Sequence, residues 1–182
     1  MFNKISILNI IKDHINTLKN NRTGKLSYLD IILFFLLPCV VSSLLIYTGI
    51  SLNDALANAL ITSLSIFSAL LFNLLLLVYD ISDKKLNLPE TNDEFEKIQR
   101  SKIRNLLQEI YINISFSILV SITTVTTLLI YFVKISNCIF FSINICSFQW
   151  LLALVIYYLI IQFALNLIMI LKRIYILLSK SF

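Results

Sequence analysis

The sequence has 182 residues, of which 58% are hydrophobic and 14% are charged, and its net charge is +5. Soluble domains have about 25% charged residues, so this chain has too few polar side chains to cover its apolar surface in water, which excludes an ordinary soluble domain. Two Gly and two Pro in the whole chain exclude an all-β fold, which needs frequent turn residues, and favour a few long helices.

The first predicted element is an amphipathic helix within residues 3–20, part of a cytoplasmic N-terminal segment at 1–28. Its apolar residues recur at helical spacing: Ile5, Leu8, Ile11, Ile15 and Leu18. Two placements are open for this helix: in the inner membrane interface, or packed on the cytoplasmic ends of the other helices. The single histidine, His14, falls on the polar side, so we expect it to be solvated.

Four stretches without a central charge follow, each long enough to cross a hydrocarbon core of about 30 Å as a helix. They predict a four-transmembrane-helix bundle, one domain over 29–182, with spans near 29–50, 55–79, 110–133 and 148–171. Pro38 removes a backbone donor from the first span and predicts a kink there.

Basic residues predict the orientation of these spans. Fourteen of the fifteen Lys and Arg residues lie in the N-terminal segment, the loop at 80–109 or the C-terminal tail, and the other is Lys134. Since basic loops stay in the cytoplasm, both termini and the 80–109 loop are predicted to be cytoplasmic in the cell inner membrane.

The cytoplasmic loop carries a helix start signal. Thr91 followed by Glu94 fits a capping box, so a helical cytoplasmic extension is predicted to run from there into the third span. Its charged residues favour a solvated face. Apolar residues placed among them keep open a docking surface for a cytoplasmic protein, with these candidates: Phe95, Ile98, Arg100, Lys102 and Arg104.

Polar residues form stripes within three of the predicted spans. Such stripes are typical of helix–helix contacts, within one chain or between copies. The less favoured alternative is that they line a polar path through the membrane. The candidates are Asn58, Thr62, Ser65 and Asn73 in the second span, Asn113, Ser117, Ser121 and Thr124 in the third, and Gln162 and Asn166 in the fourth.

The sequence lacks the motifs of common enzymes and cofactor sites. There is no Gly-rich phosphate loop, metalloprotease motif or pair of intramembrane carboxylates, so we predict no catalytic residue, metal, cofactor or nucleic-acid contact. Cys39 is interpreted as a small apolar filler. Cys138 and Cys146 lie in the predicted loop between the third and fourth spans, outside the cytoplasm. Two free thiols are favoured there over a disulfide between them.

These features favour a bacterial inner-membrane subunit that forms homo-oligomers in the lipid bilayer and serves as a sensor or anchor for a cytoplasmic partner, in a multi-component system such as antiphage defence. One alternative is a pore-forming or membrane-depolarising effector of the holin or abortive-infection type. A small-solute channel or carrier is weaker, since the chain has no internal repeat, Gly-broken helix or charged binding group.

Overall fold

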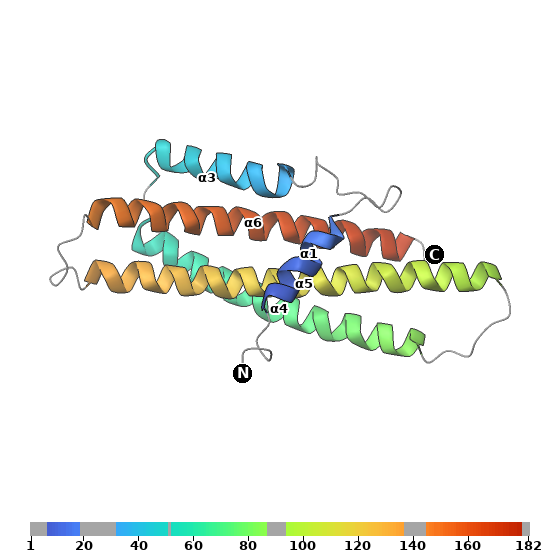
Figure 1. Ribbon diagram of the computed structural model, residues 1–182. Coiled ribbons are helices and arrows are strands. Elements are labelled where there is room, and N and C mark those ends of the chain that lie inside the picture. The colour runs from blue at the N-terminus through green and yellow to red at the C-terminus, as the bar shows by residue number, and fades with distance from the viewer. Residues whose placement is uncertain (1–6, 19–31, 51, 87–93, 137–144, 180–182) are drawn as a thin grey trace. The chain divides into compact units, whose positions relative to one another are not determined.

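The computed structural model describes residues 7–18, 32–50, 52–86, 94–136 and 145–179. In this part of the chain all regular structure is helical (Figure 1). In chain order the elements are α1 (Ile7–Thr17), η2 (Ile32–Leu36), α3 (Leu37–Tyr47), α4 (Asp54–Leu86), α5 (Glu94–Ser136) and α6 (Ile145–Ser179).

Three of these helices, α4, α5 and α6, are long and apolar enough to cross a membrane. The first predicted span, 29–50, is shorter in the described residues, where its apolar helix covers Ile32–Tyr47. Its predicted start at Leu29 lies outside the described residues. The structure is therefore consistent with an all-α membrane protein that has three long apolar helices.

The first predicted span is irregular around its proline. A π-helical turn, η2, is followed directly by α3, and Pro38 lies in the first turn of α3. Proline cannot donate to the carbonyl four residues earlier and fits best in the first turn of a helix, where this donor is not needed. The regular α-helix accordingly begins at Leu37, next to Pro38.

Helix α5 is one continuous helix of 43 residues that contains both the charged loop segment and the predicted third span. It begins at Glu94, and both Glu94 and Glu96 lie in its first turn. Carboxylates there interact favourably with the free N–H groups and the positive end of the helix dipole. Thr91, the predicted cap, lies outside the described residues.

The chain divides into two compact units, and α4, α5 and α6 each contribute a part to both. The first unit covers 1–26, 70–118 and 166–182, and the second covers 27–69 and 119–165. In the first unit, apolar side chains of α4, α5 and α6 are buried. They are Leu71, Val78, Leu107, Ile110, Ile114 and Ile170.

In the second unit a pair of serines joins α4 to α5. The Ser68 hydroxyl donates to Ser121 Oγ at 2.7 Å, and the Ser121 hydroxyl donates to the Leu64 carbonyl at 3.2 Å. Phe67 of α4 meets Phe163 of α6 edge to face, with ring centroids 6.1 Å apart. The two serine hydroxyls thus find hydrogen-bond partners where α4 packs on α5.

Ser121→Ala is expected to lower the free energy of unfolding by about 1 kcal/mol, because it removes both hydrogen bonds between α4 and α5. Ser115→Ala is the control, since the Ser115 hydroxyl only bonds the Tyr111 carbonyl of its own helix. Unfolding by SDS titration in mixed micelles measures both. Equal losses for the two variants would contradict the role assigned to Ser121.

Candidate functional site

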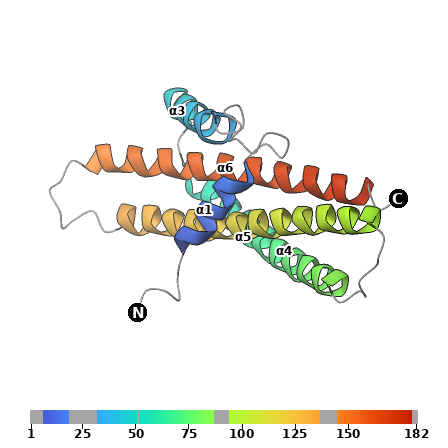
Figure 2. The ribbon, with the colours of Figure 1, turned by 45° about the vertical axis from the view of Figure 1, so that its right-hand side comes forward.

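The most polar buried cluster of the first unit forms where α1 crosses α5 and α6, a crossing visible from both directions of view (Figures 1 and 2). His14 of α1 is only 1% exposed, so the prediction of a solvated His14 was wrong. The sequence did contain a signal for burial. His14 comes three residues after Ile11 and four before Leu18, which places it at the edge of the apolar face.

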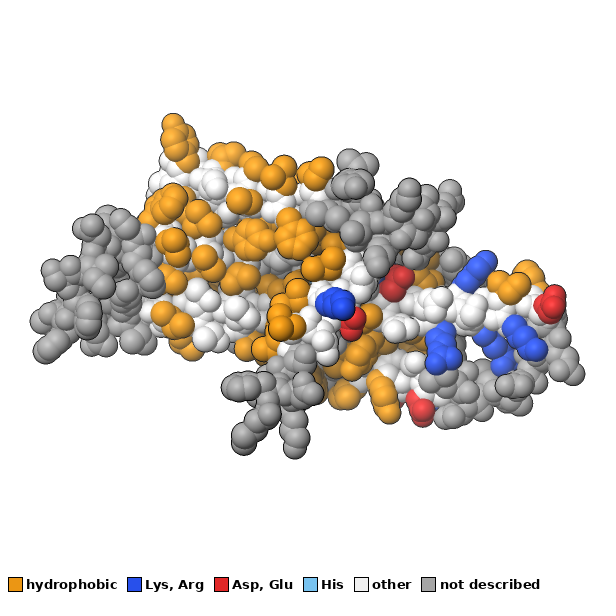
Figure 3. Space-filling view, in the orientation of Figure 1, with side chains coloured by type: hydrophobic (Ala, Val, Ile, Leu, Met, Phe, Trp, Pro, Cys, Tyr) orange, Lys and Arg blue, Asp and Glu red, His pale blue; other side chains and the backbone are white. Residues whose placement is uncertain are grey.

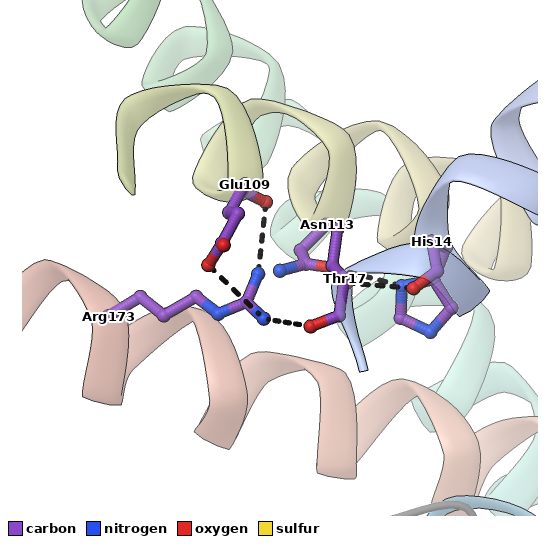
Figure 4. A network of polar contacts seen from close by, with 5 residues as sticks. All are labelled: His14, Thr17, Glu109, Asn113 and Arg173. Carbon is purple, nitrogen blue, oxygen red and sulfur yellow. Dashed lines mark hydrogen bonds and ion pairs between the residues drawn. The ribbon is translucent and has the colours of Figure 1, made fainter. Parts of the chain in front are cut away.

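The side-chain oxygen of Asn113 on α5 lies within hydrogen-bond distance of two side chains of α1 (Figure 4). Its Oδ1 lies 2.9 Å from His14 Nδ1 and 3.0 Å from Thr17 Oγ1. Because an amide oxygen only accepts hydrogen bonds, Nδ1 of His14 carries the proton in this pair. The His14 ring also stacks on Phe116, with centroids 3.9 Å apart and planes 7° from parallel. The imidazole is therefore held by one polar and one aromatic contact on α5.

Arg173 of α6 connects all three helices. Its guanidinium donates to the Thr17 carbonyl at the end of α1 at 2.9 Å and to the Glu109 carbonyl of α5 at 3.3 Å. It also lies 3.6 Å from the Glu109 carboxylate. A cation at the C-terminus of a helix stabilises the negative end of its dipole and satisfies a terminal carbonyl. Arg173 thus caps α1 while it pairs with α5.

The pKa of His14 is lowered to about 4, mainly because the ring is buried; the hydrogen bond with Asn113 raises the pKa in part, and the positive charge of Arg173 adds a smaller lowering. His14 is consequently neutral at pH 7. Within the described part of the chain, no three His, Cys, Asp or Glu side chains gather as a metal site. The geometry supports helix docking: hydrogen bonds to Asn113 and Arg173 hold α1 on α5 and α6, and the ion pair of Arg173 with Glu109 joins α6 to α5.

The predicted polar stripes separate into buried and exposed sets. Those of α5 and α6 are buried: Asn113, Ser117, Ser121, Thr124, Gln162 and Asn166. Those of α4 are exposed at the surface of the chain: Asn58, Thr62, Ser65 and Asn73. Hydropathy alone could not distinguish the two sets, because both have the same helical spacing.

The predicted docking residues lie on the first turns of α5. Phe95 is 74% exposed and Ile98 is 53% exposed, and Lys102 and Arg104 are exposed as well. Arg100 pairs with Glu96 one turn earlier, with 3.0 Å between the guanidinium nitrogen and the carboxylate oxygen. Figure 3 shows basic side chains gathered on this part of α5, with hydrophobic ones beside them.

The predicted outer-loop cysteines are not described by the structure. Cys138 lies outside the described residues, and of Cys146 only the backbone, in α6, is described. Cys39 is a free, exposed thiol on α3.

Fold and site together define a class: in the described residues the regular structure is helical, with three apolar helices long enough for a membrane and a short helix held on two of them by polar contacts. No protein-family model, curated protein or solved structure matches the chain.

Proposed function

We propose that the chain is a multi-pass subunit of a bacterial inner membrane that anchors a cytoplasmic protein through the first turns of α5. The observation that carries this proposal is the exposure of Ile98 on a segment rich in charge. With Glu94, Lys97, Lys102 and Arg104 around it, this segment is too polar to lie in the hydrocarbon core. An apolar side chain beside cations suits a partner surface with an apolar pocket and an acidic rim.

The placement of this segment in the cytoplasm rests on the distribution of basic residues. Nearly all Lys and Arg residues lie in the two tails and the loop between α4 and α5. Helix α1 belongs to the same side in this proposal, since Arg173 and Lys172 mark the end of the apolar part of α6. The docked α1 and the start of α5 would then face the same compartment as the partner.

A photo-crosslinking residue at position 98 is expected to give one discrete protein adduct in native membranes. The same residue at position 122, which is 60% exposed on the apolar part of α5, serves as the lipid-facing control. Lys102→Glu combined with Arg104→Glu should weaken the position-98 adduct about tenfold, because an acidic rim would then be repelled. Adducts with lipid alone at both positions would refute the anchoring role.

A further inference from the structure

Two asparagines of the first unit bury amide atoms that lack hydrogen-bond partners among the described residues. Asn166 of α6 is 0% exposed, and this holds for both its amide nitrogen and its amide oxygen. Asn113 of α5 is also 0% exposed, and it holds there for the amide nitrogen alone, because the oxygen contacts two side chains of α1. Buried polar groups nearly always bond to protein or to ordered water, so these three atoms point to a ligand.

The helix register brings the two amides to nearly the same level. In the first unit α5 and α6 run in opposite directions, and Arg173 contacts both the carbonyl and the carboxylate of Glu109. Asn113 follows Glu109 by four residues on α5. Asn166 precedes Arg173 by seven residues on α6. Both asparagines therefore lie on the helix faces that this contact joins, offset by about 4.5 Å along the helix axes.

The residues next to these amides on the two helices are apolar and offer no hydrogen bond. Ile110 and Ile114 of α5 are fully buried, and Ile170 of α6 is buried one turn after Asn166. An amide atom in apolar surroundings without a hydrogen bond destabilises the fold, and lipid supplies neither donors nor acceptors. A small polar molecule between α5 and α6 would remove this cost.

The three amide atoms define the chemistry of that molecule. The nitrogens of Asn113 and Asn166 donate hydrogen bonds, whereas the oxygen of Asn166 accepts them. Amide N–H groups disfavour a cation and an amide oxygen disfavours an anion, so the ligand is neutral and both accepts and donates. Water fits, because two hydrogen bonds through one water oxygen span roughly 4.5–5 Å, close to the offset of the two asparagines.

We propose that α5 and α6 of the first unit hold one water molecule, bridged between the Asn113 nitrogen and the Asn166 amide. Figure 4 shows the Asn113 nitrogen pointing away from His14. By accepting a hydrogen bond from this nitrogen, the water keeps the Asn113 oxygen turned toward His14 and Thr17. The site goes beyond the cytoplasmic anchoring proposed above, and does not depend on it.

NMR cross-relaxation between water and side-chain amide protons tests this site in the full chain, reconstituted in nanodiscs. The side-chain amide protons of Asn113 are expected to give a cross-peak with water whose sign is that of a bound molecule tumbling with the protein. Rotating-frame spectra separate this signal from proton exchange, because the two effects then have opposite signs. No water cross-peak at Asn113 would overturn the proposal.

Variants at Asn166 test the second half of the bridge. Asn166→Leu fills the site with methyl groups, so it should weaken the Asn113 cross-peak at least tenfold. Asn73→Leu is the matched control, because it removes an exposed asparagine of the same unit and should leave the cross-peak unchanged. Asn166→Ser keeps a hydroxyl and should retain it, which provides a second test if the leucine variant fails to fold.

Three results at Asn166 and Asn113 would contradict a bridging water. The first is an Asn113 cross-peak that is indifferent to Asn166→Leu. The second is a cross-peak between the two side-chain amides at the strength of a direct hydrogen bond. The third is a cross-peak from these amides to the carbon-bound protons of another solute.

Discussion

Arg173→Met is expected to release α1 from α5 and α6. The substitution removes the cap on the Thr17 carbonyl, the hydrogen bond to the Glu109 carbonyl and the ion pair with the Glu109 carboxylate. Only the bond to the Thr17 carbonyl joins Arg173 to α1, and loss of this hydrogen bond from a charged donor should cost about 2 kcal/mol. An 11-residue helix is marginal by itself in water and depends on such contacts.

Hydrogen exchange of the α1 backbone in nanodiscs measures this release. A loss of about 2 kcal/mol corresponds to exchange about thirtyfold faster over Ile7–Thr17. Lys172→Met is the matched control, because it removes the neighbouring exposed cation and leaves the α1 contacts intact. Unchanged protection of α1 in the Arg173 variant would show that the contacts with Asn113 and the apolar face hold α1 without Arg173.

Docking of α1 is also expected to weaken as the pH falls from about 6.5 to about 4. The pKa of His14 is lowered to about 4 in the docked state, from 6.5 when the ring is free in water. Between these values the undocked state binds the proton first, so the contribution of His14 is complete above pH 6.5 and is lost as the pH approaches 4. The full change is about 3 kcal/mol.

Because His14 is the only histidine in the chain, an NMR titration of its imidazole carbons reports this pKa directly. The groups around the ring are Asn113 and Phe116 of α5 and the Arg173 cation of α6, which is paired with Glu109. His14→Gln should make the protection factor of α1, the intrinsic exchange rate divided by the observed rate, nearly independent of pH between 4 and 6.5. A measured pKa near 6.5 in the intact chain would contradict the buried position of the ring.

The long helices could be predicted from the sequence because their signal is local. Uncharged apolar stretches of about 20 residues indicate spanning helices, and the described residues contain three helices of this kind. The capping box predicted a helix from Thr91 into the third span; α5 runs as one helix over Glu94–Ser136, and Thr91 lies outside the described residues. The first span is the exception, where the described apolar helix is shorter than predicted and begins with a π-helical turn.

The site was harder to predict because it depends on contacts between distant residues. His14 and Asn113 are 99 positions apart, and Thr17 and Arg173 are 156 apart. Asn113 was recognised as a polar residue in a span, but the sequence did not reveal that its partners are on α1. Arg173 was counted only among the basic residues of the C-terminal tail, because a count of charges assigns no partner to a guanidinium.

The continuity of α5 has a mechanical consequence. Ile98 and Asn113 are 15 residues apart on one unbroken helix, a separation of about 22 Å along its axis. A bound protein that rotates or tilts the first turns of α5 would also rotate the Asn113 amide, which bonds His14 and Thr17. Binding of a protein at the start of α5 would in this way favour release of α1 from Asn113. Release of α1 would favour that binding by the same free energy.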